Sequence, residues 1–153
     1  MAGFLAIAVN GNPMQPAQSL SNPHMPTCLI VEDSVFDSER MRRVLARSHY
    51  GFTVEVATTL ACARAALARG KAALILLDNN LPDGLGTNFA LELSRDEHLS
   101  HIPVIMVSDW PSPFMWEKAA AAGVRYVLSK REFDTRYVHA ALRDNRPLRA
   151  HVH

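Results

Sequence analysis

The most constraining feature of this sequence is the regular alternation of short apolar segments with stretches of helical periodicity. The apolar segments are residues 28–31, 53–57, 74–77, 103–107 and 126–128. The helical stretches that follow them are residues 36–48, 59–69, 87–95, 114–122 and 133–142. Segment 74–77 is apolar at every position, which is typical of a strand buried on both faces. The pattern predicts five successive βα units.

Repeated βα units leave few possible architectures. Crossovers between parallel strands are right-handed, so the units build an open parallel sheet that is covered by helices on both faces. We therefore expect an α/β fold with a doubly wound, five-stranded parallel sheet. Ligands of such sheets bind beyond the carboxyl ends of the strands, which makes the residues directly after each strand the candidate site.

The composition excludes several classes of protein. A length of 153 residues suits one domain, and 48% hydrophobic with 20% charged residues is typical of a soluble globular chain. A net charge of +1 argues against bulk nucleic-acid binding, which needs many unpaired basic residues. Two cysteines are too few for a disulfide framework, and no apolar run approaches the length of a membrane helix. We expect a reduced, cytoplasmic protein that binds neither nucleic acid nor membrane.

The two ends of the chain differ from its centre. Residues 1–26 carry no charge and contain four prolines, which predicts an irregular leader. The domain itself is expected over residues 27–144, followed by a short basic tail at 145–153 that we interpret as a solvated end. Eleven residues follow Leu142, too few for an additional output domain, so we expect a stand-alone domain.

Chemically active side chains follow four of the five apolar segments. Glu32 and Asp33 follow the first, Asp78 the third, Ser108 the fourth and Lys130 the fifth. Three carboxylates held close together raise one another's pKa unless they share a cation, and Mg²⁺ prefers such oxygen ligands. Any one acid alone would more simply be a turn former or a helix cap. Together they predict a magnesium site at one edge of the sheet.

Four segments of the sequence resemble a known family. They are LIVEDS (29–34), LILLDNNLPDG (74–84), PVIMVS (103–108) and AAGVRYVLSK (121–130). They are similar to the receiver domain of two-component response regulators, over about residues 27–144. The resemblance implies the flavodoxin-like (βα)5 receiver fold. It also implies a phosphoacceptor signalling protein rather than an enzyme, which acts with a sensor histidine kinase or a phosphotransfer protein and with a downstream protein target.

The resemblance also implies roles for individual residues. Asp78 would be the phosphoacceptor and would form an acyl phosphate. Asp33, Asp78 and the backbone carbonyl of Asn80 would hold Mg²⁺, with Glu32 acting on it mainly through water. Lys130 would pair with the phosphoryl oxygens. Phosphoryl transfer needs positioning and charge neutralisation more than covalent help, so these groups suit the reaction.

Two further expectations concern the response to phosphorylation. Ser108 is similar to the family's switch hydroxyl, which turns inward to bond the phosphoryl group. The output face would be formed by the fourth helix, the fifth strand and the fifth helix. Phosphorylation would then bias this face between two states that differ in their affinity for a protein target.

The sequence departs from the usual receiver pattern beside the site. Asp109 stands where a small residue is common, and its charge would disfavour a phosphorylated product unless it points to solvent or pairs with a base. Trp110 would either shield the acyl phosphate from water or lie exposed. Val127 occupies the position of the switching aromatic, with Tyr126 expected on the opposite face of the strand. Arg131 replaces a common proline.

Two other interpretations remain open at this point. The departures above motivate a pseudo-receiver, a scaffold that binds its partner without phosphorylation. A phosphatase of the haloacid dehalogenase type also uses an aspartate nucleophile with Mg²⁺. That family requires a second aspartate two residues after the nucleophile as general acid, and this chain has Asn80 there. The amide argues against the phosphatase.

Overall fold

The computed structural model describes residues 25–143. The expected leader (1–26) and basic tail (145–153) lie almost entirely outside the described residues. Within residues 25–143, no helix is long and apolar enough to cross a membrane.

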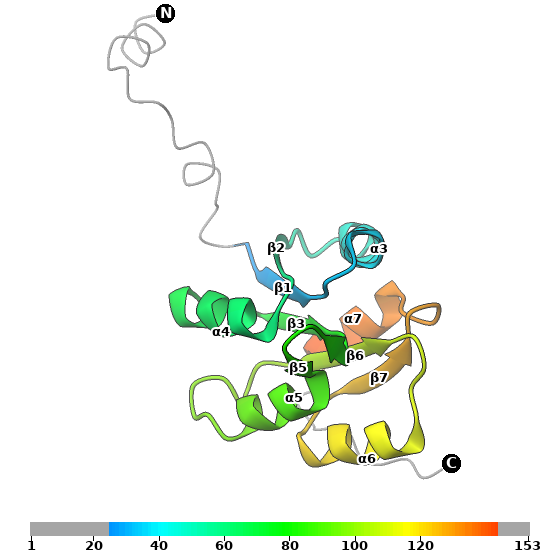
Figure 1. Ribbon diagram of the computed structural model, residues 1–153. Helices are drawn as coiled ribbons and strands as arrows, with labels where there is room; N and C mark the ends of the chain where they lie inside the picture. Colours follow the sequence, from blue (N-terminus) through cyan, green and yellow to red (C-terminus); the bar gives the residue numbers. More distant parts are fainter. Residues whose placement is uncertain (1–24, 144–153) are drawn as a thin grey trace, which may run out of the picture.

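A five-stranded sheet forms the centre of the molecule (Figure 1). Its strands are β1 (Thr27–Val31), β2 (Thr53–Ala57), β3 (Leu74–Leu77), β6 (Val104–Ser108) and β7 (Tyr126–Ser129). They lie in the order β2-β1-β3-β6-β7, and every neighbouring pair is parallel. The strand order reverses at β1, beside β3, where such sheets bind ligands. The predicted doubly wound parallel sheet is confirmed.

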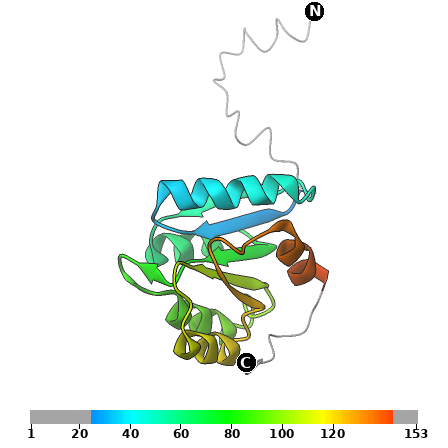
Figure 2. The ribbon, with the colours of Figure 1, turned by 90° about the vertical axis from the view of Figure 1, so that its right-hand side faces the viewer.

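Five helices cover the two faces of this sheet. They are α3 (Val35–Arg47), α4 (Leu60–Arg69), α5 (Gly86–Ser94), α6 (Pro113–Ala121) and α7 (Thr135–Arg143). Helices α3 and α7 pack on one face, and α4, α5 and α6 pack on the other (Figures 1 and 2). The helix and strand bounds lie within two residues of those predicted, because hydrophobic periodicity is a local property of the sequence.

The helices begin where the sequence supplies a capping oxygen. The side chain of Ser34 accepts the backbone N–H of Asp37 at 3.2 Å, and that of Thr59 accepts the N–H of Cys62 at 3.0 Å. Such bonds satisfy N–H groups that have no partner within the helix. The cap at Ser34 matters for the site because it sets where the first turn of α3 begins, directly after β1.

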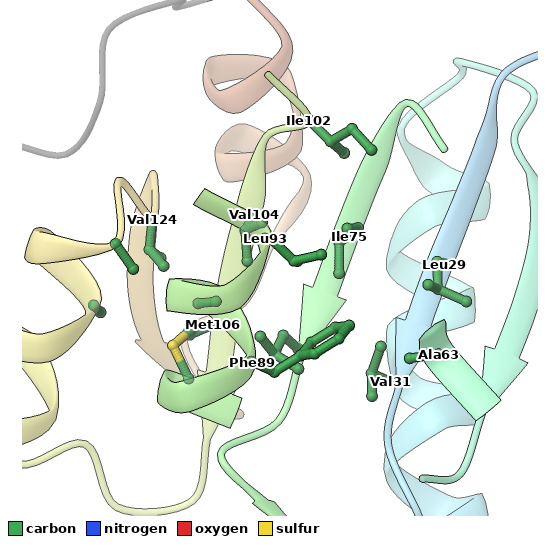
Figure 3. Packing of buried hydrophobic residues seen from close by; sticks show 14 of the residues in the cluster. Leu29, Val31, Ala63, Ile75, Phe89, Leu93, Ile102, Val104, Met106 and Val124 are labelled. Atoms are coloured by element: carbon green, nitrogen blue, oxygen red, sulfur yellow. The ribbon is translucent and has the colours of Figure 1, made fainter. Parts of the chain in front are cut away.

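The core lies on both sides of the sheet. Leu29, Val31 and Ile75 point toward α4, α5 and α6, where they pack around Phe89 (Figure 3). The intervening Ile30 belongs to the cluster under α3 and α7. This alternation is the pleat of a strand buried on both faces. Packing on both faces positions the carboxyl ends of the central strands at one edge of the sheet.

One element was not predicted. The turn after β3 contains a small antiparallel pair, β4 (Asn80–Leu81) with β5 (Gly84–Leu85). Two-residue strands carry too little hydrophobic pattern for the sequence to reveal them. Gly84 has φ 156°, a backbone conformation that favours glycine in this turn.

Candidate functional site

Three carboxylates converge at the carboxyl ends of β1 and β3. Glu32 and Asp33 follow β1, and Asp78 follows β3, its neighbour in the sheet. One oxygen of each side chain lies within 4.8 Å of the others. Glu32 and Asp78 are buried, whereas Asp33 is exposed to solvent. The edge predicted from the strand order therefore does bring these acids together.

Burial makes the two inner carboxylates unusually basic. Desolvation raises the pKa of Glu32 to about 7, against a backbone hydrogen bond from Ser34 that lowers it. Desolvation likewise raises the pKa of Asp78 to about 6, although the charge of Lys130 and backbone hydrogen bonds act in the opposite direction. The surroundings of each of these two carboxylates therefore disfavour its negatively charged form. A cation placed between the acids would relieve this cost.

Lys130 is the basic group of the site. Its Nζ lies 3.1 Å from Oε2 of Glu32 and 3.9 Å from Oδ1 of Asp78. The contact with Glu32 is an ion pair, and among residues 25–143 no group donates a hydrogen bond to the buried Oε2 of Glu32. Burial alone would lower the pKa of Lys130, but hydrogen bonding and the surrounding acids outweigh it and the pKa is raised.

Two further carboxylates, both outside the predicted set, also contact Lys130. Asp37, in the first turn of α3, accepts a hydrogen bond from its Nζ at 2.7 Å. Oδ2 of Asp109 lies 3.6 Å from the same Nζ, and its side chain is 62% exposed. Asp109 thus pairs with a base. Sequence reasoning missed Asp37 because acids are common in the first turn of a helix, where the helix dipole favours them.

The loop that carries Asp78 is held by its own neighbours. Oδ1 of Asp78 accepts the backbone N–H of Asn79 at 2.9 Å. The side chain of Asn79 in turn accepts the N–H of Thr87 at 3.1 Å, and its carbonyl accepts the N–H of Gly86 at 2.8 Å. A Cβ atom at Gly86 would collide with the carbonyl oxygen of Asp78. Asn79 and Gly86 therefore position Asp78, and neither was among the predicted site residues.

Comparison with known proteins identifies the family. The model of the response regulator receiver domain matches residues 28–143. This chain belongs to the response regulator receiver family. No curated protein sequence matches it significantly.

Solved structures share the receiver fold. The Mn²⁺-bound form of response regulator Rcp1 is 24% identical, with 76% of this chain and 89% of that chain covered and a TM-score of 0.65. A CheY-like receiver domain protein from Methanospirillum hungatei is 22% identical (78% and 91% covered, TM-score 0.66). A signal receiver domain from Colwellia psychrerythraea is 15% identical (78% and 99% covered, TM-score 0.71). At these identities the likeness shows the fold alone.

The other predicted site residues of this receiver domain lie at the same edge. Ser108 ends β6, is 2% exposed, and its carbonyl accepts the N–H of Lys130 at 3.0 Å. Asn80 is exposed and begins β4, two residues after Asp78. Asp83 accepts the N–H groups of Leu60 and Ala61 at the start of α4, as a helix cap would.

The residues that depart from the usual receiver pattern lie in different environments. Trp110 is 87% exposed, so its indole does not shield Asp78 from water in this structure. Val127 is buried in the cluster under α4, α5 and α6. Tyr126 lies on the opposite face, as predicted, where its ring contacts that of Tyr137 with centroids 5.4 Å apart.

The acidic cluster of this receiver domain fits a hard divalent cation. All ligand atoms are carboxylate oxygens, two of them come from buried side chains, and Oε2 of Glu32 has no hydrogen-bond donor in the part of the chain that the structure describes. Mg²⁺ and Mn²⁺ accept such ligands and retain several waters, for which the exposed Asp33 leaves room.

A cavity of about 490 Å³ opens beside Lys130, between α3 and the segment after β7. Its lining includes five arginines, namely Arg40, Arg43, Arg47, Arg131 and Arg136. None of the five forms a salt bridge with a carboxylate of the described residues 25–143. The same lining also contains three acids, Asp37, Glu132 and Asp134, so that its basic side chains, with Lys130, outnumber its acidic ones by six to three.

Proposed function

We propose that this chain is a phosphoacceptor response regulator that is phosphorylated on Asp78. The observation that carries the proposal is the meeting of Asp78, Lys130 and the acidic pair Glu32 and Asp33 at one sheet edge. Asp78 supplies the nucleophile, Lys130 supplies positive charge, and the acids supply ligands for a cation.

The proposed cation site consists of Asp33, Asp78 and the backbone carbonyl of Asn80, with Glu32 acting through water. When bound, Mg²⁺ would neutralise the charge of the carboxylates and of the phosphoryl oxygens. The buried position of Asp78 matters here, because its raised pKa reflects a carboxylate that is poorly solvated and therefore reactive once deprotonated.

The proposed reaction is a phosphoryl transfer. A carboxylate oxygen of Asp78 forms a bond to phosphorus while the bond from phosphorus to a histidine nitrogen of the partner breaks. The nitrogen keeps that electron pair and the histidine becomes neutral imidazole after proton exchange with solvent. Lys130 pairs with a phosphoryl oxygen as a point charge. Ser108, at the end of β6, donates its hydroxyl to another phosphoryl oxygen and draws the following loop inward.

The wider setting follows from this chemistry. The phosphodonor would be a sensor histidine kinase or a histidine phosphotransfer protein in the cytoplasm. The output would be phosphorylation-dependent binding of a protein target, and the protein would act as a signalling protein rather than as an enzyme. We further propose residues 27–144 as the receiver unit, with the leader (1–26) and tail (145–153) outside it.

The decisive experiment is intact-mass measurement after incubation with acetyl phosphate and Mg²⁺. We expect the mass of one phosphoryl group to be added to the wild type and to Glu97→Gln, which changes an exposed acid away from the site. We expect no addition to Asp78→Asn, or to the wild type with chelator. These four samples separate specific from adventitious phosphorylation.

Rapid hydrolysis could remove the adduct before measurement. A titration with beryllofluoride, which mimics a phosphoryl group on aspartate, therefore accompanies the mass experiment. If the wild type shows neither an adduct nor Mg²⁺-dependent beryllofluoride binding, the phosphoacceptor proposal is wrong, and a pseudo-receiver scaffold becomes the better account.

A further inference from the structure

The ammonium of Lys130 is engaged by Asp37 rather than by the proposed phosphoacceptor. Its Nζ donates to Oδ2 of Asp37 at 2.7 Å, whereas Oδ1 of Asp78 lies 3.9 Å away, beyond hydrogen-bond distance. The side chain of Lys130 is only 10% exposed and that of Asp37 19%, so water screens this pair weakly. The 2.7 Å contact is the shortest of the four carboxylate contacts of Lys130.

The position of Asp37 is set by the backbone. Its N–H donates to the capping oxygen of Ser34 at 3.2 Å, which fixes the first turn of α3 directly after β1. The backbone of Lys130 is also held by a hydrogen bond, because its N–H donates to the carbonyl of Ser108 at 3.0 Å. The hydrogen bond between the two side chains therefore joins two backbone segments that are each held by a hydrogen bond of their own.

A phosphoryl group on Asp78 needs the same ammonium. Its oxygens carry up to two negative charges and are strong hydrogen-bond acceptors, like the carboxylate of Asp37. In this arrangement the ammonium donates to Asp37 and lies in an ion pair with Glu32 at 3.1 Å, whereas Oδ1 of Asp78 is 3.9 Å away. To reach the phosphoryl oxygens, Lys130 must leave or weaken its bond to Asp37.

We infer that Asp37 is a positioning residue that holds Lys130 away from Asp78 and thereby opposes binding of the phosphoryl group. This inference rests on the proposed function, since it concerns the same site. The Asp37–Lys130 pair stabilises the unphosphorylated state, so it lowers the affinity of the site for the phosphoryl group. The pair breaks when Asp78 is phosphorylated.

The test measures the affinity for beryllofluoride in the presence of saturating Mg²⁺. Asp37→Asn and Asp37→Ala are each expected to bind beryllofluoride on the order of tenfold more tightly than the wild type. This gain corresponds to the loss of one charge-assisted hydrogen bond that stabilises the unphosphorylated state. Glu39→Gln is the matched control, because it removes the same charge from an exposed position on the same helix. Its affinity is expected to stay within twofold of the wild-type value.

Removing an acid near the site could also act merely by reducing the negative field. A double-mutant cycle with Lys130→Met separates the two mechanisms. If Asp37 acts through Lys130, Asp37→Asn changes the affinity less than twofold in the Lys130→Met background. An equal gain in both backgrounds would overturn the inference, and so would an unchanged affinity of Asp37→Asn and Asp37→Ala. Thermal unfolding of each variant verifies that it is folded.

The outcomes also distinguish this inference from the proposed function. If the wild type binds beryllofluoride and the Asp37 variants bind it equally well, only the role of Asp37 is wrong. If the wild type and the Asp37 variants all fail to bind it, the phosphoacceptor chemistry is wrong and the role of Asp37 falls with it.

Discussion

Gly86 lies directly against the carbonyl oxygen of Asp78, in a space that no side-chain carbon can enter. We predict that Gly86→Ala displaces the loop of Asp78 and lowers the free energy of unfolding by about 1–3 kcal/mol, although alanine favours helices. The affinity for beryllofluoride should fall as well, because Asp78 moves relative to Lys130. Urea unfolding and the beryllofluoride titration measure the two effects.

Gly70→Ala is the control for this substitution. A Cβ atom at Gly70 meets no atom within 4 Å, and its φ of −163° is extended backbone that any residue adopts. Its effect on stability should stay within about 0.5 kcal/mol. Equal stability of the Gly86→Ala and Gly70→Ala proteins would show that the contact with Asp78 is not a tight one.

Glu32 should make the protein less stable as pH rises. Its folded-state pKa of about 7 lies above the ordinary value of 4.5, so the folded protein binds the proton more tightly than the unfolded chain. This contribution to stability is fully present below pH 4.5 and is lost as pH rises through 7. Without divalent cations, Glu32→Gln should therefore gain stability relative to wild type between pH 5 and pH 8, on the order of 2 kcal/mol.

Denaturant unfolding at several pH values in the presence of a chelator measures this difference. Added Mg²⁺ should raise the wild-type unfolding midpoint at pH 8, because a bound cation offsets the cost of burying the charge on Glu32, which protonation removes at low pH. Glu97→Gln, a substitution on the surface, should track the wild type throughout. A stability difference between Glu32→Gln and wild type that does not vary with pH would show that Glu32 titrates normally.

Asp109 should weaken phosphoryl binding less than Asp37 does. Its Oδ2 lies 3.6 Å from Nζ of Lys130, but its side chain is 62% exposed, so water and salt screen its charge. We expect Asp109→Asn to raise the beryllofluoride affinity about twofold at low ionic strength. The gain should vanish in about 0.5 M salt, where screening is strong. A gain that survives high salt would point to a steric effect of Asp109 instead.

Trp110 should report the movement of the loop after β6. Its side chain is 87% exposed and lies two residues after the proposed switch residue Ser108. If the Ser108 hydroxyl moves toward a phosphoryl group, the surroundings of the indole change. We predict that beryllofluoride with Mg²⁺ shifts the tryptophan emission of the wild type and of Trp116→Phe, which leaves Trp110 as the chain's single tryptophan.

The same emission change should be absent from Ser108→Ala, although that variant still binds beryllofluoride through Asp78 and Lys130. Equilibrium binding measured by calorimetry provides the independent check that the ligand is bound. An emission change of full size in Ser108→Ala would show that the loop moves without the serine hydroxyl, and would contradict this prediction.

The sequence by itself determined the fold class and the edge at which the site forms. Hydrophobic periodicity is local, so the five βα units and their bounds could be predicted to within two residues. The carboxyl ends of parallel strands meet at one edge, so the convergence of Glu32, Asp33 and Asp78 followed from their positions after β1 and β3. Family resemblance then suggested the roles that we propose for these residues, which residue types alone leave open.

Only the tertiary structure decided which neighbour each site residue contacts. Asp37 and Lys130 are 93 residues apart, and Asp83 caps a helix that begins 23 residues earlier in the chain. Nζ of Lys130 lies 2.7 Å from Asp37 and 3.9 Å from Asp78, a difference that tertiary packing sets and no local pattern encodes. The interactions of charged groups depend steeply on such distances, because their hydrogen bonds are short and directional. The ion pairs and the pKa shifts of the site therefore could not be predicted from the sequence.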